Sequence, residues 1–227
     1  MTIPTTKSHK RQWQRYFVYR KESLKTTWTL RLSVLLVGIL IVWLTRGIWT
    51  LEIGKSLVCK EQTATSDALL LENFDPDWLV FKRAAALQRS GIADRVLVPV
   101  SGTDSQIPNP VSKAIAEIMV RMGRLEQTQF IPINLTEPIS LNAANQIRDF
   151  LTSQNLKSIL VVSPGFRSRR SALVYNAVLG PADIRVGCVP VFGESPTPED
   201  WTKTWHGIED VAEQFLKLQY YRFYVLR

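Results

Sequence analysis

Residues 159–170 read ILVVSPGFRSRR, in which four consecutive apolar side chains lead into a serine–glycine turn and an arginine-rich helix start. An apolar run without alternation is typical of a strand covered on both faces, as in a parallel sheet. Four more runs of this kind occur, at 68–71, 96–100, 130–133 and 186–191. With helical patterns between them, they predict an α/β domain with a mostly parallel sheet and helices on both sides.

The segments between these runs carry apolar residues at three- and four-residue spacing, the pattern of a helix with one buried face. Three such stripes are expected to face the core: Ile115, Ile118, Met119 and Met122; Ile147, Phe150 and Leu151; and Ile208, Val211, Phe215 and Leu218.

Prolines and capping residues refine these boundaries. Helix starts are expected where a capping side chain precedes a proline, at Asp75-Pro76, Asn109-Pro110 and Thr197-Pro198. Three further prolines fall within predicted strands and are expected at strand ends or edges, because proline has no N–H to donate: Pro99, Pro132 and Pro190.

The positive charge of the chain is concentrated at its start. The formal net charge is +8, and residues 1–31 alone hold eight basic residues against one acidic residue. The rest of the chain is therefore almost neutral, whereas a nucleic-acid-binding domain carries a basic face in its folded part. We expect no nucleic-acid partner.

Cysteine and histidine are scarce. Two cysteines, Cys59 and Cys188, and two histidines, His9 and His206, are too few for a four-cysteine zinc site or a multi-histidine centre. We therefore expect no metal and no cofactor. In an oxidising compartment the two cysteines can pair, but the sequence leaves open whether they meet or remain free thiols.

Residues 32–45 read LSVLLVGILIVWLT and contain no charged side chain. Extended to 28–49, the segment makes a helix of about 33 Å, enough to cross ~30 Å of hydrocarbon. The alternative is a cleaved signal peptide, but residues 45–49 offer no small-residue cleavage site, and we favour a retained signal anchor. Because positive residues stay in the cytoplasm, we expect a cytoplasmic tail (1–27), a transmembrane helix (28–49), a connector (50–65) and an extracytoplasmic domain (66–227).

Ligands of open α/β sheets bind beyond the carboxyl ends of the strands, so the polar loops there are candidate sites. The sharpest signal is the arginine-rich loop after 159–162, because a helix start and guanidinium groups together favour phosphate or carboxylate. Alternatively, these arginines face water or pair with Glu137 or Glu194. The residues expected to line an anion site are Ser101, Gly102, Glu137, Ser140, Asn142, Ser163, Arg167 and Arg169.

Three familiar catalytic motifs are absent from the sequence. No G-x-G-x-x-G follows the first predicted strand, and neither a G-x-x-x-x-G-K-[ST] loop nor a G-x-S-x-G nucleophile elbow occurs. The one histidine after the apolar segment, His206, stands beside tryptophans, where histidine usually packs or faces solvent. We assign no catalytic residue.

The order of several short motifs resembles the SanA/ElyC/YdcF family of envelope-associated proteins. The matching segments are Asp67-Ala-Leu-Leu-Leu, Arg83-Ala-Ala-Ala-Leu with Ser90-Gly91, Val100-Ser101-Gly102, Glu117, Glu137-Pro-Ile-Ser140-Leu-Asn142 and Ser163 through Arg169. The resemblance implies a three-layer Rossmann-like domain behind one N-terminal membrane helix. Two departures stand out, because Glu72-Asn73 replaces the family's glycine pair and Phe166 takes the position of its histidine.

The same resemblance implies a bacterial inner-membrane protein whose periplasmic domain serves cell-envelope or exopolysaccharide biogenesis. The expected partners are the lipid bilayer, envelope or polysaccharide biosynthesis proteins, and an anionic small molecule or lipid-linked sugar phosphate. The alternative is a catalytically degenerate member that acts as a membrane-tethered scaffold, which Phe166 and the lost glycine pair favour. Whether the chain is an enzyme is left open.

Overall fold

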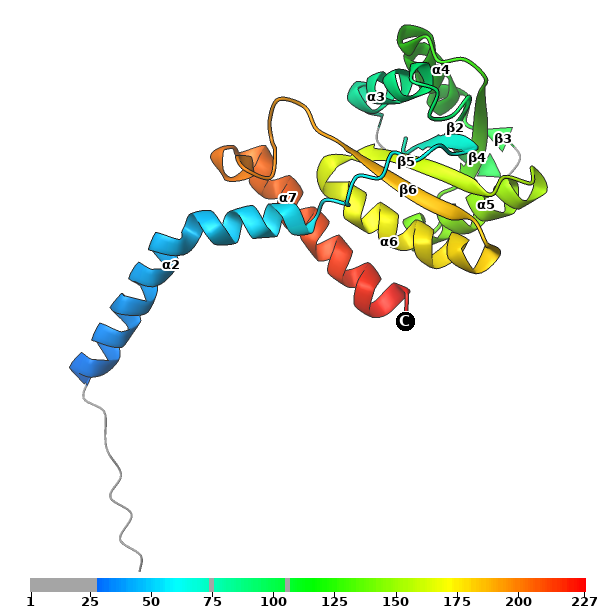
Figure 1. Ribbon diagram of the computed structural model, residues 1–227. Helices are drawn as coiled ribbons and strands as arrows, with labels where there is room; N and C mark the ends of the chain where they lie inside the picture. The colour runs from blue at the N-terminus through cyan, green and yellow to red at the C-terminus, as the bar shows by residue number, and fades with distance from the viewer. Residues whose placement is uncertain (1–27, 74–75, 105–106) are drawn as a thin grey trace, which may run out of the picture. The chain divides into compact units, whose positions relative to one another are not determined.

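Figure 1 shows the chain as a computed structural model, which describes residues 28–73, 76–104 and 107–227. By its internal contacts the chain divides into two units, Met1–Arg46 and Gly47–Arg227. The expected cytoplasmic tail at 1–27 and the expected cap Asp75 lie outside the described residues.

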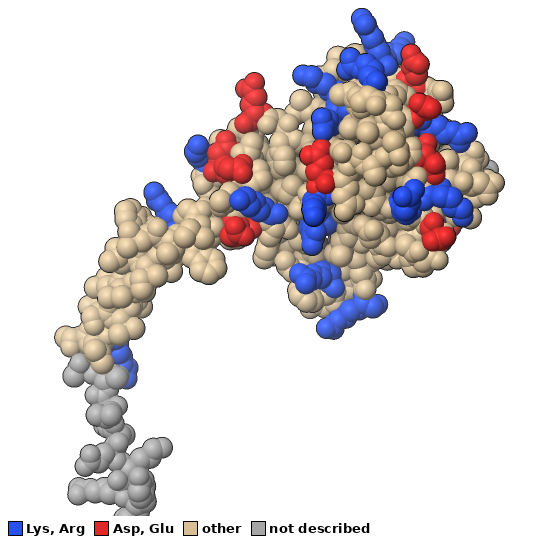
Figure 2. Space-filling view, in the orientation of Figure 1, with Lys and Arg blue, Asp and Glu red and all other residues tan. Residues whose placement is uncertain are grey.

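Helix α2 (Trp28–Ser56) begins in the first unit and ends in the second. It has no polar face, and side chains such as Leu36 and Leu40 are more than half exposed. Within the described ranges it is the one helix long and apolar enough to cross a membrane, and Figure 2 shows a long stretch of it without charged side chains. The helix continues to Ser56, so residues 50–56, predicted as connector, are helical.

Five strands form the parallel sheet that the apolar runs predict. They are β4 (Thr128–Asn134), β2 (Arg95–Asp104), β1 (Ala68–Leu71), β5 (Ser158–Pro164) and β6 (Arg185–Val191), named in their spatial order. This order matches the first five strands of a Rossmann sheet. A further strand, β3 (Ile107–Pro108), pairs antiparallel with the end of β2 and was not predicted, because two residues leave no recognisable apolar run.

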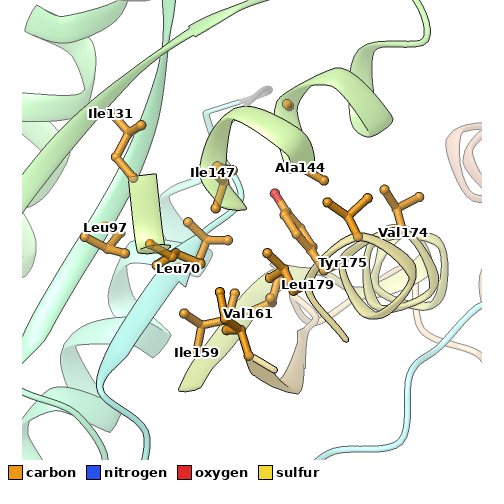
Figure 3. Close-up of a cluster of buried hydrophobic side chains, with 14 of the residues drawn as sticks. Leu70, Leu97, Ile131, Ala144, Ile147, Ile159, Val161, Val174, Tyr175 and Leu179 are labelled. Carbon is orange, nitrogen blue, oxygen red and sulfur yellow. The ribbon is translucent and has the colours of Figure 1, made fainter. Parts of the chain in front are cut away.

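Helices connect consecutive strands of the sheet. The remaining elements are α3 (Trp78–Arg89), α4 (Pro110–Gly123), α5 (Ile139–Ser153), η1 (Gly165–Arg167), α6 (Ser168–Leu179), η2 (Gly180–Ala182), η3 (Trp201–Lys203), α7 (Trp205–Tyr220) and the π-helical turn η4 (Tyr221–Val225). Alternate residues of β1 enter two different buried clusters, because successive strand side chains point to opposite faces. Leu70 joins residues of α5 and α6 (Figure 3), whereas Leu69 and Leu71 join residues of α3.

The predicted core stripes are confirmed in α5 and only partly elsewhere. Ile147 and Leu151 of α5 are fully buried. The prediction for α4 is partly wrong, because its buried residue is the small Ala116 and Ile118 and Met122 are more than half exposed, although Met119 packs against the core. The periodic pattern identifies the side of α4 with the largest apolar residues. The helix instead packs on the side that carries Ala116, because a small residue allows a closer approach to the sheet.

The predictions for helix caps and strand prolines are also confirmed only in part. The Asn109 side chain caps α4 as predicted, accepting from the Val111 N–H at 2.9 Å. No α-helix starts after Thr197, which instead forms a turn in which the Asp200 carboxylate accepts from its backbone N–H. Pro132 and Pro190 lie in the outer strands β4 and β6, as expected, whereas the expectation for Pro99 is wrong, because it lies within β2, between β1 and β4.

The chain between α2 and β1 covers the outer edge of β6. The Gln62 N–H donates to the Cys188 carbonyl at 2.9 Å, and Cys59 forms a disulfide with Cys188 across a Cα–Cα distance of 6.4 Å. Gly187 leaves the space for this approach, since a Cβ there would lie 3.1 Å from the Gln62 carbonyl oxygen. The disulfide settles the pairing that the sequence left open, and the covered edge is unavailable to other strands.

Asp67 ties the start of β1 to the start of β5. Its carboxylate accepts the backbone N–H groups of Lys157 at 2.7 Å and Ser158 at 2.8 Å. These bonds, led by the one from Lys157, hold the pKa of Asp67 below its usual value. These bonds fix the register of β1 against β5 at the start of both strands. The same register sets which residues lie together at their carboxyl ends.

Candidate functional site

The carboxyl ends of β1 and β5 lie at the topological switch point of the sheet, where the order of the strands reverses. From β1 the chain proceeds to β2 on one side, and β5 lies on its other side. Loops diverge at such a point, and it is where open α/β sheets bind ligands. Here Glu72 directly follows β1, and Ser163 is near the end of β5.

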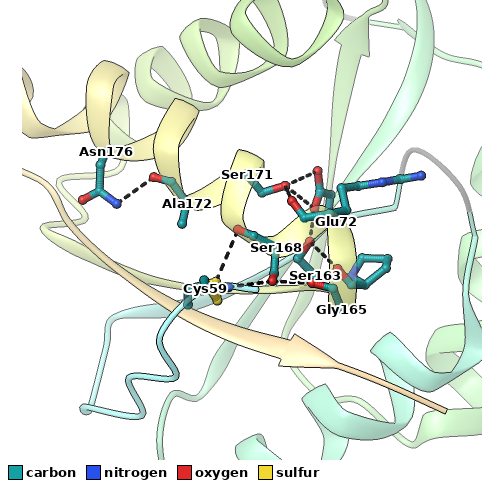
Figure 4. Close-up of a disulfide and its surroundings, with 11 residues drawn as sticks. Cys59, Glu72, Ser163, Gly165, Ser168, Ser171, Ala172 and Asn176 are labelled. Carbon is teal, nitrogen blue, oxygen red and sulfur yellow. Dashed lines mark hydrogen bonds between the residues drawn. A yellow bond between two sulfur atoms is a disulfide. The ribbon is translucent and has the colours of Figure 1, made fainter. Parts of the chain in front are cut away.

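Glu72 is a buried carboxylate held by hydroxyl groups from two elements. Ser171 of α6 lies 2.6 Å and 2.8 Å from its two oxygens, and Ser163 of β5 also donates to it (Figure 4). The Glu72 backbone N–H donates to the Val162 carbonyl at 3.0 Å. A buried carboxylate is costly unless it accepts hydrogen bonds, and the two serines supply them.

Arg170 is a buried cation with neutral hydrogen-bond partners. It is 7% exposed, and its guanidinium donates to the Ser140 hydroxyl at 2.6 Å and to the Gln214 side-chain oxygen at 3.3 Å. Its Cζ atom lies 5.5 Å from the ring centre of Tyr221, whose phenol oxygen accepts the Ser140 backbone N–H at 2.9 Å. The buried Nε has no hydrogen-bond partner, so one donor remains for another acceptor.

The two opposite charges influence the groups around them. Burial, followed by the negative charge of Glu72, raises the pKa of Tyr175 well above its usual value, while Arg170 acts in the opposite direction. Burial also raises the pKa of Asp210 on α7, and a hydrogen bond with Gln214, followed by the charge of Arg167, opposes that shift. Tyr175 therefore stays a neutral phenol beside the site, and the positive charge of Arg167 reaches α7.

These residues open onto a hollow of about 270 Å³, here called the switch pocket. It is lined by Glu72, Glu137, Ile139, Ser140, Arg167, Arg170, Lys217, Tyr220 and Tyr221. Three basic side chains and two carboxylates face one space with an aromatic wall. Such a pocket suits a ligand that combines an anionic group with hydroxyl groups.

Two other hollows lie at the sheet. A more open one, of about 560 Å³, is at the amino edge and is lined by loop residues such as Asp67, Asp94 and Asn155. The other, of about 310 Å³, lies beyond β1 and β2, where the Asn73 side-chain oxygen is buried without a hydrogen-bond partner. Neither is lined by a buried charge, which distinguishes the switch pocket from both.

Four of the residues predicted to line an anion site gather at the switch pocket. Glu137, Ser140 and Arg167 line it, and Ser163 lies directly behind Glu72. Asn142 shapes the adjoining loop, because its side-chain amide donates to the carbonyls of Thr136 and Glu137, each at 3.0 Å.

The other three predicted residues lie elsewhere. Ser101 lines the hollow beside Asn73, and Gly102 pairs with Asn134 and Pro108 within the sheet. Arg169 is exposed, and its backbone N–H donates to the Leu57 carbonyl at 3.0 Å.

Sequence reasoning missed Glu72, Arg170 and Tyr221 as site residues. Glu72 could have been found as the first charged residue after a fully apolar strand. Arg170 lies about 100° around α6 from Arg169, so choosing between them required knowing which side faces the sheet. Nothing local indicates Tyr221, which reaches Ser140 from 81 residues away.

Phe166 belongs to a buried apolar cluster instead of the switch pocket. It packs edge-to-face on Phe192 with ring centres 5.3 Å apart, together with Leu57, Val211 and Leu218. Gly165 permits this packing, because a Cβ there would lie 2.0 Å from the Phe192 ring. The position at which the resemblance expects a histidine is thus filled by packing.

Within the described ranges, no group of three histidine, cysteine or acidic side chains is placed to hold a metal ion. No protein-family model matches the chain, and no curated protein matches its sequence.

Proposed function

We propose that this chain is a membrane-anchored extracytoplasmic protein that binds a phosphate- or sugar-phosphate-like group in the switch pocket. In this proposal the α/β unit has a three-layer Rossmann-like arrangement, as in the SanA/ElyC/YdcF family it resembles. It acts as a bacterial inner-membrane accessory of cell-envelope or exopolysaccharide biogenesis.

The observation that carries the proposal is the state of Arg170. A guanidinium that is 7% exposed donates its hydrogen bonds to two neutral side chains, and the acidic residues Glu72 and Glu137 line the same pocket without accepting a hydrogen bond from it. Removing a charge from water is costly unless an opposite charge or strong acceptors replace the solvent. A phosphate oxygen in the pocket supplies both, and it also gives the buried Nε an acceptor.

The rest of the lining favours a ligand with hydroxyl groups. Glu72 and Glu137 are acceptors for hydroxyl donors, and an anion alone would be repelled by both. Tyr220 and Tyr221 provide apolar ring surface beside these polar groups. A sugar phosphate combines the two chemistries, with its phosphate at Arg170 and its hydroxyls at the glutamates.

The anchor and the compartment rest on three observations. Helix α2 is long and apolar enough to cross a membrane. The eight basic residues among the first 31 favour a cytoplasmic N-terminus. The Cys59–Cys188 disulfide suits an oxidising compartment, which a periplasmic domain would occupy.

A second candidate function is a membrane-tethered scaffold that has lost its chemistry. Phe166 favours it, because a buried aromatic ring packed on Phe192 cannot transfer a proton. In this case the charged network around Glu72 serves folding, and the pocket takes no ligand.

Calorimetric titration of the full chain in detergent micelles, with glucose 1-phosphate and with neutral glucose, separates the two functions. We expect glucose 1-phosphate to bind and glucose to bind far more weakly. Arg170→Met removes the buried guanidinium and should weaken glucose 1-phosphate binding by about 10- to 100-fold, since a hydrogen bond to a charged group contributes about 1.5–3 kcal/mol.

Arg169→Met is the matched control, because it removes the same charge from the adjacent, exposed position. It should leave the affinity within about twofold of wild type, as expected for a solvent-exposed charge that does not line the pocket. Circular dichroism confirms that each variant is folded. If neither ligand binds the wild type, or if both variants lose affinity equally, the switch pocket is not an anion site and the scaffold function is favoured.

A further inference from the structure

Helix α7 carries two adjoining apolar faces, one buried and one exposed. Val211 and Leu218 on one face are buried against Leu57 and Phe166. On another face, Trp205, Ile208, Phe215 and Leu216 are exposed, with Trp205 and Leu216 at 72% and 68%. At about 100° per residue, these four side chains span an arc of about 100°, the width of a helix face that normally meets an apolar partner. They are called the α7 stripe below.

The α7 stripe continues past the helix end. Phe223 and Tyr224 in η4 are also exposed, and they are flanked by Arg222 and Arg227. Exposed aromatic and apolar residues are typical of helices that lie in a membrane interface. Arg222 and Arg227 supply the positive charge at this end, whereas α7 itself carries three acidic residues against Lys217.

The start of α7 is fastened to the end of the apolar helix. The Trp201 indole N–H, four residues before α7, donates to the Thr50 carbonyl at 2.9 Å. Gly54 allows close packing here, because a Cβ would lie 3.0 Å from the Pro198 backbone. Thr50 directly follows Trp49, the last residue of the expected span, so with that span in a bilayer α7 would begin near the bilayer surface.

We propose that the α7 stripe lies on the surface of the anionic bilayer in which α2 is anchored. This inference rests on the proposed membrane anchor and adds a second point of contact to it. A single span leaves the attached unit free to rotate and tilt, whereas a stripe held at the headgroups fixes one orientation.

The contact also positions the switch pocket. Lys217, Tyr220 and Tyr221 line that pocket from another side of the same helix and its continuation. The pocket therefore lies about one helix diameter, ~10 Å, from the headgroups. A phosphate carried on a membrane lipid can reach it without leaving the bilayer.

The test compares two single-cysteine probes on α7 in the full chain, reconstituted in vesicles of phosphatidylcholine and phosphatidylglycerol. Leu216→Cys lies on the stripe, and Glu213→Cys lies one turn away on the charged face, where both native side chains are exposed. Without reductant the native cysteines stay in their disulfide and do not react. A water-soluble maleimide should label position 216 about tenfold more slowly than 213, as expected for a leucine-sized site removed from water.

Three outcomes overturn the proposal in distinguishable ways. Equal labelling rates in a chain that floats with the vesicles show that the anchor holds and the stripe faces water. Protection at 216 that disappears when protein is diluted in excess lipid shows that a second copy covers the stripe. A chain that does not float with the vesicles removes the anchor itself. Protection that persists on dilution supports the membrane contact.

Discussion

Replacing Glu72 with alanine is expected to lower the free energy of unfolding by about 3 kcal/mol, because hydrogen bonds to a buried charged group each contribute about 1.5–3 kcal/mol. The variant loses the acceptor shared by Ser163 and Ser171. It also removes one of the two acidic residues that line the switch pocket together with the buried Arg170. Urea titration of the full chain in detergent micelles, followed by near-ultraviolet circular dichroism, measures the loss.

Glu117→Ala is the control for removing a glutamate. Glu117 is partly exposed on α4, and its Oε1 lies 3.7 Å from the Lys113 Nζ, so its loss should change stability by less than about 0.5 kcal/mol. Glu72→Gln keeps an acceptor for the serines but removes the charge, and it should tighten binding of inorganic phosphate by about 3- to 10-fold. Unchanged stability in Glu72→Ala would contradict the assignment of Glu72 as the centre of the buried network.

Removing the disulfide is expected to cost about 4 kcal/mol of stability in the double variant Cys59→Ser, Cys188→Ser, because the bond closes a very long loop in the unfolded chain. The two cysteines are separated by 129 positions. The bond also holds the segment after α2 against the edge of β6, where Gln62 donates to the Cys188 carbonyl. The same denaturation, with and without dithiothreitol, gives the measurement.

In the measurement with dithiothreitol, the double variant serves as the control. Dithiothreitol should destabilise the wild type to the level of the double variant and leave the double variant unchanged. Limited proteolysis should then cut the segment between α2 and β1 faster, since it has lost its covalent attachment. If reduction changes neither stability nor proteolysis, the bond does not hold this segment in solution.

The strands could be predicted from the sequence because their signal is local. The run at 68–71 matches β1 residue for residue, and the other four runs fall within the observed strands. Buried parallel strands need apolar residues on both faces, so composition alone reveals them. The two residues of β3 carry no such signal, and their pairing with β2 includes a shift in register between Gly102 and Asp104.

Helix orientation could be predicted less well, since a periodic stripe does not show which neighbour it meets. On α4 the small Ala116 faces the sheet, and the larger Ile118 and Met122 remain outside. On α7 the expected stripe combined residues from two faces, of which Val211 is buried and Phe215 is exposed.

In the candidate site, too, local features could be predicted and long-range contacts could not. The loop after β5 was identified because its serine and arginines occur within a few residues. The network itself joins Glu72 to Ser171 across 99 positions and Arg170 to Gln214 across 44. Pairings at such separations are decided by the assembled sheet and helices, which is also why the disulfide stayed open at the sequence level.

The claim on which this account depends is that α2 anchors the α/β unit on the oxidising side of a membrane. Fusing alkaline phosphatase and green fluorescent protein in turn to the C-terminus, in bacterial cells, tests it most directly. The account predicts an active phosphatase, which needs disulfides, and a dark fluorescent protein exported through the general secretion route. An inactive phosphatase together with a bright fluorescent fusion would place the unit in the cytoplasm and contradict the account.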